Sequence, residues 1–311
     1  MQKYAIGIDI GGTRTKTGLA DINEGSVLDW MVSPTERYDA GLFISSLYGQ
    51  YSSLLEKNGI AREMISGLGI GAPGFVYEDG SVDSTFGFLP FMDAHYPLKE
   101  RLEQTFKLPC RVDNDARIVA LGEAMFGRGK GYRRVLVLTL GTGLGLGFIV
   151  NGKFETKLPY AHLGGHMTIA TSDIQCYCGR RGCMEALVSA TGIIEAASRA
   201  GWAKMNPDTP LTAEFVFEAA LNGNETAVSI ISDLIENLKT GISNFITLLA
   251  PDIIIIGGGV SKALIPYLDQ IRKLNYLKPF TFYNFEIVLS ELDEHSGILG
   301  SAALFIPQKN N

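Results

Sequence analysis

The sequence lacks an apolar stretch of transmembrane length, a run of lysines or arginines, and a low-complexity linker. The first absence argues against a membrane-spanning helix, and Asp9 interrupts the first strand-like segment, which would spoil the apolar core of a signal peptide. With a net charge of −6, the lack of basic runs argues against nucleic acid or an anionic membrane as the main partner. We therefore expect a cytoplasmic protein that binds neither nucleic acid nor membrane.

The amino-acid composition, with 46% hydrophobic residues and 36 glycines, is typical of a compact α/β enzyme. It excludes a disordered or fibrous chain. At 311 residues the chain exceeds the size at which a single core keeps growing, so we expect two domains.

Cysteine is scarce, but three of the four cysteines fall within residues 176–183. Thiolates and one imidazole form the tetrahedral shell that zinc prefers, and Gly179 and Gly182 let the chain bend so that the sulfur atoms converge. The alternative is a set of unliganded thiols, or a disulfide among them. The pattern favours a compact zinc loop with four ligands: His166, Cys176, Cys178 and Cys183.

Two glycine turns occur in similar surroundings. The apolar segment 4–8 ends at Asp9 and opens into glycines 11 and 12, and the strand-like segment 15–20 follows. Segment 135–140 likewise runs into the glycine-rich stretch 141–147, after which a strand resumes at 148–150. Backbone N–H groups in such turns can approach an anion because glycine has no side chain in the way. We expect two related halves with a polyphosphate between them, although neither turn matches the P-loop or the dinucleotide fingerprint.

The remaining chain alternates strands and helices. Strands are expected at 67–71, 111–114 and 252–256; helices at 116–126, 224–249, from residue 260, and at 298–305; and a loop at 203–212.

Asp9 places a carboxylate beside the first glycine turn, where a magnesium ion would fit. Mg2+ retains several waters and usually takes few carboxylates, so Asp9 is expected to hold it through water. The alternative is an aspartate that simply ends a strand in a β-turn.

Three polar residues, 113–115, lie where a strand is expected to meet a helix, which is a common position for functional residues in an open α/β sheet. Asp115 is the candidate general base that removes the proton from an attacking hydroxyl, and Asn114 would fix that hydroxyl. The alternative is that Asp115 only caps the helix.

Several segments together resemble the ROK family of bacterial sugar kinases and sugar-responsive repressors. The clearest are Asp9-Ile10-Gly11-Gly12-Thr13 and the cysteine loop followed by Glu185. The similarity covers nearly the whole chain in the order of the family, through residues 9–13, 114–116, 141–147, 165–166, 176–185, 257–259 and 300–303.

The resemblance implies an α/β fold of the actin-like, hexokinase-type (ribonuclease H-like) class of ATPases, with two domains, a cleft between them, and usually a homodimer. We expect the amino-terminal domain to span residues 1–117, with the carboxy-terminal helix 298–311 packing back on it. The second domain, which carries the zinc loop, would span 118–297.

By position, the resemblance makes Asp115 the base that deprotonates a sugar hydroxyl, commonly at C6. His166 would bind both zinc and sugar, and the zinc would be structural. The implied sugar-binding residues are Asn114, Glu185, His166, Gly74 and Phe88. The residues implied for Mg-ATP are Asp9 for the magnesium ion and Gly11, Gly12, Thr13, Thr142, Gly143, Gly258 and Gly259 for the nucleotide.

Three positions depart from the kinases of the family. Leu163 stands where they usually have a sugar-contacting Glu, Phe88 where they have an Asn, and Arg117 where an Asn is common. A lost hydrogen bond to a sugar hydroxyl is worth on the order of 1 kcal/mol, so a conventional glucose pocket is not expected. Phe88 and Leu163 indicate a more apolar wall, and His162 or Arg117 can supply replacement contacts.

The sequence thus favours an ATP-dependent sugar kinase acting on a hexose or hexose derivative. One alternative is a sugar-responsive regulator, but those relatives carry an amino-terminal helix-turn-helix domain, whereas here the first strand is expected at about Tyr4. The other is a sugar-binding protein without catalysis, against which the retained Asp115 argues.

Overall fold

The structure is a computed structural model that describes residues 3–84, 88–155, 161–202, 210–274 and 284–306. By the packing of its backbone the chain divides into two compact units. The first comprises Met1–Gly131, Ile149–Glu155 and Leu292–Asn311, and the second comprises Tyr132–Phe148 and Thr156–Glu291. The predicted domain boundaries at 117/118 and 297/298 stay a prediction.

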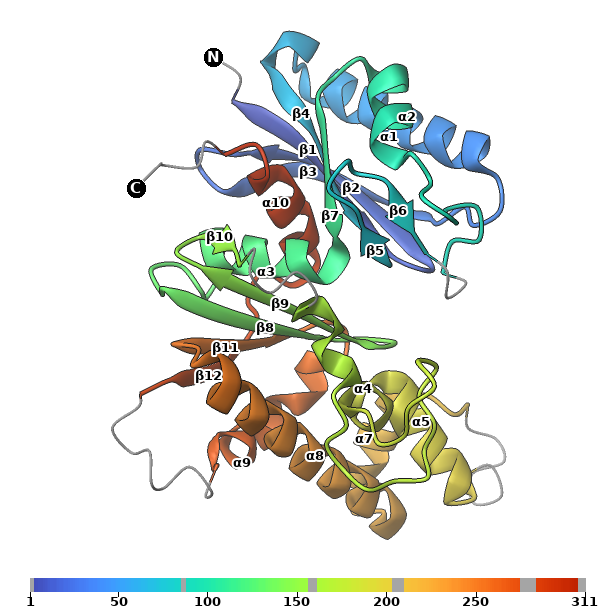
Figure 1. The fold of residues 1–311 in the computed structure, drawn as a ribbon, viewed down its shortest axis with the longest axis vertical. Helices are drawn as coiled ribbons and strands as arrows, with labels where there is room; N and C mark the ends of the chain where they lie inside the picture. Colours follow the sequence, from blue (N-terminus) through green and yellow to red (C-terminus); the bar gives the residue numbers. More distant parts are fainter. Residues whose placement is uncertain (1–2, 85–87, 156–160, 203–209, 275–283, 307–311) are drawn as a thin grey trace. The chain divides into compact units, whose positions relative to one another are not determined.

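The first unit is built on a sheet with the strand order β3-β2-β1-β4-β7 (Figure 1). The three strands that follow one another in the sequence are antiparallel, and β4 and β7 join them in parallel. A small hairpin of β5 and β6 follows β4. The strands are β1 (Tyr4–Ile10), β2 (Arg14–Asp21), β3 (Ser26–Pro34), β4 (Ile65–Ala72), β5 (Phe75–Val76), β6 (Val82–Asp83) and β7 (Cys110–Asn114).

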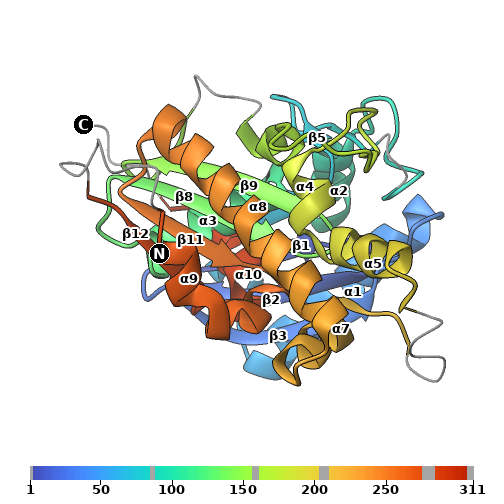
Figure 2. The same ribbon diagram turned by 90° about the horizontal axis from the view of Figure 1, so that it is seen from below.

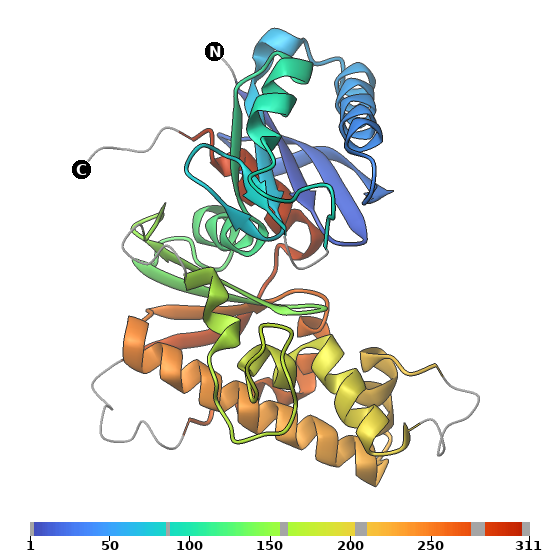
Figure 3. The ribbon, with the colours of Figure 1, turned by 45° about the vertical axis from the view of Figure 1, so that its right-hand side comes forward.

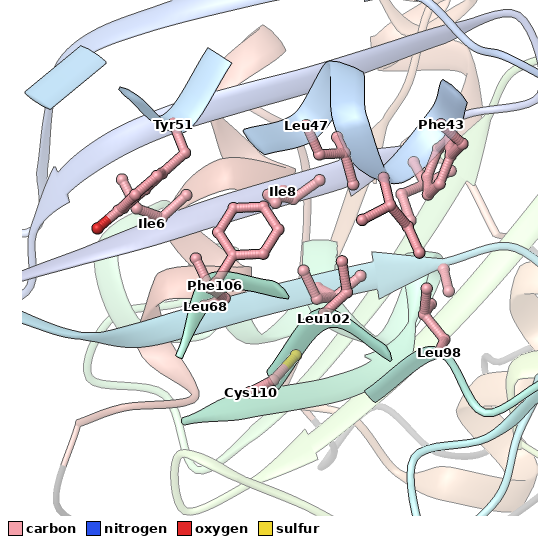
Figure 4. Packing of buried hydrophobic residues seen from close by; sticks show 14 of the residues in the cluster. Ile6, Ile8, Phe43, Leu47, Tyr51, Leu68, Leu98, Leu102, Phe106 and Cys110 are labelled. Carbon is pink, nitrogen blue, oxygen red and sulfur yellow. The ribbon is translucent and has the colours of Figure 1, made fainter. Parts of the chain in front are cut away.

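One face of this sheet forms a large apolar core with α1 (Ala40–Asn58) and α2 (Leu98–Phe106). Side chains alternate along a strand, so Ile6 and Ile8 of β1 point to this face. They pack with Phe43 of α1 and Phe106 of α2 (Figure 4). Asp39 caps α1 by accepting a hydrogen bond from the N–H of Leu42, at 2.9 Å.

The opposite face of the sheet is covered by α10 (Ser296–Ala303), which approaches the strands unusually closely. A Cβ atom at Gly69 of β4 would overlap the backbone carbonyl of Ser301, and a Cβ atom at Gly300 would overlap the carbonyl of Ile118 in α3 (Asp115–Phe126). Backbone therefore packs directly on backbone, which requires glycine at these positions. The hydroxyl of Ser301 also donates to the carbonyl of Ile8, at 3.0 Å.

The second sheet has the strand order β10-β9-β8-β11-β12; β8, β11, β12 and most of β9 belong to the second unit, whereas β10 and the last two residues of β9 are counted with the first. All five residues of β11 are buried, as expected for a central parallel strand. The long helix α8 runs along one face of this sheet (Figure 2), and Asn224 caps its start. The strands are β8 (Arg134–Leu140), β9 (Leu144–Val150), β10 (Lys153–Phe154), β11 (Ile253–Gly257) and β12 (Glu286–Leu289).

The helices of the second unit connect and cover this sheet. The loop between η2 and α4, yellow-green in Figure 3, folds back on itself through the bridge pairs Thr168–Cys183 and Gln175–Arg181. The α-helices among the described residues of this unit are α4 (Met184–Val188), α5 (Ala190–Arg199), α7 (Ala213–Leu221), α8 (Glu225–Leu249) and α9 (Leu268–Arg272). The short 3-10 helices in the described part of the whole chain are η1 (Arg62–Met64), η2 (Ala161–His166), η3 (Ser261–Tyr267) and η5 (Asp293–His295).

Most expected elements are present, with two corrections. The strand after the second glycine turn begins at Leu144 rather than at residue 148, because Gly145 and Gly147 are accommodated within β9. The helix expected from residue 260 is a 3-10 helix, η3, that contains Pro266 and continues into α9. The expected loop at 203–212 lies outside the described residues up to 209, as do residues 307–311 of the expected terminal segment. Among the helices of the described chain, none is long and apolar enough to cross a membrane.

The close packing of α10 predicts that Gly300 does not tolerate a methyl group. Gly300→Ala should lower the free energy of unfolding by about 3 kcal/mol, because the added Cβ meets backbone atoms of α3 that cannot rotate away. Gly49→Ala is the matched control: Gly49 lies on the exposed side of α1 with open space at its Cβ position, so this change should stabilise the protein by up to about 1 kcal/mol. Urea unfolding measures both. Equal stabilities would show that the α3–α10 contact relaxes easily.

Candidate active site

The register of the parallel strands brings the polar residues of the first unit to one edge of its sheet. Asp9 of β1 pairs with Gly71 of β4, and Gly71 pairs with Asp113 of β7. The carboxyl ends of parallel strands meet at the same edge of a sheet. Asp9 therefore lies two strands from Asp113, after which Asn114 ends β7 and caps α3, and Asp115 begins that helix.

The Asp9 carboxylate lies beside two charged side chains, Lys16 and Glu294, and against the start of α10. The Nζ of Lys16 lies 3.5 Å from Asp9 Oδ2 and 3.0 Å from Glu294 Oε2. A Cβ at Gly297, near the start of α10, would lie 2.5 Å from Asp9 Cγ, so the carboxylate sits directly against the helix backbone. Burial raises the pKa of Asp9, Lys16 acts in the opposite direction, and Glu294 adds to the increase.

Asp115 has a strongly perturbed carboxyl group. Burial, followed by repulsion from the Asp9 carboxylate, raises the pKa of Asp115 to about 7. Its Oδ1 accepts from the N–H of Ala116 at 2.8 Å. The helix cap itself is Asn114, whose Oδ1 accepts from the N–H groups of Ala116 and Arg117. Helix capping alone therefore does not explain why an aspartate stands at position 115.

The neighbours of Asp115 are already paired. Asn114 is buried, and its Nδ2 donates to the carbonyl of Gly74 at 3.0 Å. Asp113 forms an ion pair with Arg117, 2.7 Å between Oδ1 and Nε, and the guanidinium also lies over the ring of Phe154. Asp113 is therefore neutralised by an arginine one helical turn away, whereas the groups that act on Asp115 within the described part of the chain are the Asp9 carboxylate and the hydrogen bonds from Ala116 and Asn114.

The first glycine turn is closed by backbone hydrogen bonds. The N–H of Gly11 donates to the carbonyl of Arg14 at 3.0 Å, and the Thr35 hydroxyl donates to the carbonyl of Gly11 at 2.8 Å. Thr13 is exposed. Phe88 lies beside this turn, because a Cβ at Gly12 would be 3.5 Å from its ring. The predicted sugar-site residue Phe88 thus borders a predicted nucleotide residue; Gly87, before it, lies outside the described residues.

The second glycine turn, in the second unit, is anchored by side chains of α4 and α5. The N–H of Gly141 donates to the carbonyl of Gly143, and the carboxylate of Glu185 accepts from the N–H of Leu144 at 3.0 Å. The hydroxyl of Thr191 donates to the carbonyl of Thr142 at 2.7 Å. The turn after β11 lies next to it.

That neighbouring turn contains Gly258 and Gly259, which are both exposed. Gly258 has a φ of 86°, a left-handed conformation that favours glycine. The N–H of Val260 donates to the carbonyl of Leu140, the residue before the second glycine turn, at 3.0 Å. The predicted residues Thr142, Gly143, Gly258 and Gly259 therefore lie close together.

The four predicted zinc ligands converge. Their ligand atoms all lie within 4.8 Å of one another, with 3.5 Å between Cys176 Sγ and His166 Nδ1 and 3.6 Å between the Sγ atoms of Cys178 and Cys183. Tetrahedral ligands at about 2.3 Å from zinc are about 3.8 Å apart, so the donor set fits the ion. The four cysteines are free, which removes the disulfide alternative. Burial raises the pKa of Cys183 to about 12, so a thiolate there calls for a bound cation.

Tyr177 joins the cysteine loop to Glu185. Its hydroxyl lies 3.2 Å from Nε2 of His166, the ring nitrogen that faces away from Cys176. The Glu185 carboxylate also lies close enough to act on this hydroxyl. Burial, and then this carboxylate, raise the pKa of Tyr177.

Sequence reasoning missed three residues of these sites. Lys16 and Glu294 flank Asp9, but they come from β2 and from η5, far apart in the sequence. Tyr177 stands between two cysteines, and the spacing of the metal ligands gives no sign that the residue between them has a role of its own. The structure assigns the predicted residues to two units: residues 9–13, 74, 88, 114 and 115 to the first, and residues 142, 143, 166, 176, 178, 183, 185, 258 and 259 to the second.

Comparison with known proteins supports the resemblance. The sequence model of the ROK family matches residues 5–308. The glucokinase of Halalkalibacterium halodurans is 33% identical over 322 residues, covering 99% of this chain and 97% of the relative. The N-acetylgalactosamine kinase AgaK of Shewanella sp. is 29% identical, covering 96% and 95%.

A solved structure gives the same result for the fold. The ROK glucokinase of Streptomyces griseus, crystallised with glucose and AMPPNP, superposes with a TM-score of 0.78 at 29% identity, covering 97% of this chain and 98% of that one. The predicted actin-like, hexokinase-type fold is confirmed. The homodimer and the cytoplasmic location stay predictions. With a full-length family match and a glucokinase one-third identical across both chains, this chain belongs to the ROK family.

Proposed function

We propose that the protein transfers the γ-phosphoryl group of ATP to a hydroxyl, most simply the C6 hydroxyl, of a hexose or hexose derivative. The broad class, an ATP-dependent carbohydrate kinase, follows from the family and its kinase relatives. The observation that carries the finer proposal is Asp115: a carboxyl group at the start of α3 with a pKa of about 7.

Asp115 acts as the general base. A base works best when its pKa is near the working pH, because it is then both available and strong enough to take the proton. Asp115 removes the proton of the sugar hydroxyl as that oxygen bonds to the γ-phosphorus and ADP leaves. Burial and the Asp9 carboxylate give this aspartate the basicity that an ordinary surface aspartate lacks.

The nucleotide phosphates and magnesium are assigned to the glycine turns and Asp9. The first turn offers Gly11, Gly12 and Thr13, and the second set offers Thr142, Gly143, Gly258 and Gly259. Backbone N–H groups in such turns attract anions. Asp9 fits magnesium bound through water, because Lys16 already occupies part of its coordination space. When bound, the ion neutralises charge on the β- and γ-phosphates.

The sugar is assigned to Asn114, Gly74 and Phe88 in the first unit and to His166 and Glu185 in the second. Phe88 is 37% exposed and Leu163 is 46% exposed, so both apolar side chains are accessible to a ligand. Both support a ligand with an apolar substituent. We therefore place an N-acetylhexosamine beside glucose in the substrate panel.

Zinc is assigned to His166, Cys176, Cys178 and Cys183 as a structural ion, since four protein ligands leave no open position. His166 binds it through Nδ1, which fixes the direction of Nε2.

The base role predicts that Asp115→Asn lowers kcat by about 100-fold to 10,000-fold with ATP and the best sugar of the panel. Sugar affinity should stay within about twofold, because an asparagine oxygen can still accept from Ala116. The control is Asp39→Asn, the same change at the capped start of α1, which should leave kcat unchanged. Coupled detection of ADP measures both. Unchanged turnover in Asp115→Asn removes this residue from the mechanism.

The raised pKa predicts the pH dependence. Below its pKa, Asp115 is protonated and cannot accept a proton, so kcat/KM should rise with pH and reach half of its plateau near pH 7. The measurement uses magnesium in excess, so that the nucleotide stays a magnesium complex. A bound cation beside Asp9 weakens the repulsion and shifts the midpoint of the kcat profile downward. A kcat/KM that is flat from about pH 5 to about pH 9 contradicts the assignment.

The metal assignment predicts that Cys178→Ser lowers both the zinc content and the sugar affinity, because His166 loses the ion that orients it. Loss of a ligand or of its supporting partner typically costs about tenfold or more in metal affinity. Cys110→Ala is the control: this thiol is buried in the core of the first unit, so zinc should be retained. Atomic emission gives the metal content and calorimetry the sugar affinity. Full sugar affinity in metal-free protein contradicts the proposal.

A further inference from the structure

Tyr177 stands out among the residues of the second unit because its hydroxyl contacts two groups to which the proposed function assigns the sugar. It lies 3.2 Å from Nε2 of His166, and the two rings meet edge to face at a centroid distance of 5.0 Å. The Glu185 carboxylate also lies close enough to act on the same hydroxyl. Yet the side chain is 53% exposed, so it is not locked in the interior.

The donors and acceptors of this contact are fixed by chemistry. Nδ1 of His166 faces Cys176, on the side of the zinc ligands, so in the metal-bound protein Nε2 carries the ring hydrogen. The Tyr177 oxygen accepts that hydrogen, which leaves its own hydrogen available to the Glu185 carboxylate, a group that only accepts. A hydroxyl that accepts from an imidazole and donates to a carboxylate does what a sugar hydroxyl would do between the same two groups.

We propose that the Tyr177 hydroxyl occupies, in the ligand-free protein, the position of one sugar hydroxyl between His166 and Glu185, and that a sugar binds by displacing it. This inference rests on the proposed function, since it takes the imidazole and the carboxylate to be sugar-binding groups.

Displacement is sterically simple. Tyr177 lies on a loop whose next glycine, Gly179, has a φ of 88° and open space at its Cβ position, and more than half of the tyrosine already faces solvent. Rotation of its side chain moves the hydroxyl into water, where its hydrogen bonds are replaced. Tyr177 is therefore a specificity-determining residue. Only a ligand that hydrogen-bonds both His166 and Glu185 compensates for displacing the Tyr177 hydroxyl.

The test is Tyr177→Phe, which keeps the ring against His166 and removes only the competing oxygen. The sugar KM at saturating MgATP, and the sugar Kd without nucleotide, should both fall by about three- to tenfold, the value of a typical hydrogen bond. The kcat should stay within about twofold, and zinc content should not change. The probes are glucose, N-acetylmannosamine and N-acetylgalactosamine.

Tyr132→Phe is the matched control, because Tyr132 also donates to a carboxylate in the second unit, Glu286, at 2.6 Å. It should leave KM and Kd unchanged. If the wild type binds and phosphorylates a probe but Tyr177→Phe has an equal or higher Kd, or loses zinc, this inference is overturned and the kinase assignment stands. If the wild type binds none of the probes, both are overturned.

Discussion

The direct packing of backbone on backbone between α10, the first sheet and α3 is the constraint on which the candidate active site depends. Gly69 and Gly300 remove the side chains that would separate these elements. As a result, the start of α10 reaches the carboxylate of Asp9 at the end of β1, and α3 is held where Asp115 begins it. Helix α10, near the carboxy terminus, and helix α3, in the middle of the chain, thus position Asp9 and Asp115 within the same unit.

This arrangement brings like charges together at a cost to stability. Asp9 and Asp115 repel each other, and burial disfavours both charges. Lys16 offsets part of the cost at Asp9 only. Because the folded pKa of Asp115 lies above the unfolded value of about 3.9, this group lowers stability progressively as pH rises from about 4 to about 7, and the cost is constant above that. Active sites commonly hold carboxyl groups whose surroundings separate their pKa values.

In the second unit a series of polar contacts positions the predicted site residues. It leads from the cysteine cluster to His166 and Tyr177, whose hydroxyl lies near the Glu185 carboxylate, and Glu185 in turn accepts from the N–H of Leu144 in the second glycine turn. Each member fixes the donor and acceptor roles of the next. A metal ion in the loop would therefore orient groups as far as the turn assigned to the nucleotide.

Much of this could be predicted from residue types and their spacing. The apolar run of β1, the two glycine turns and the capped helices are local properties, and the predicted zinc ligands come from one short loop and a histidine close before it. Local patterns failed where glycine is ambiguous: Gly145 and Gly147 suggested a turn, but they lie within β9 because neighbouring strands support them there.

The sequence by itself determined which chemical groups are available: a carboxylate after β1, polar residues before α3, and three thiols with an imidazole. The sequence also pointed to Asp115 as the candidate base. Only the tertiary structure gave the physical reason for its raised pKa, because Arg117 pairs with Asp113, while burial and the Asp9 carboxylate act on Asp115. Likewise, Tyr177 acquires its contact with His166 only when the cysteine loop has folded. The physical reason is that pKa values and hydrogen-bond partners depend on distances between segments far apart in the chain, which strand register and helix packing set.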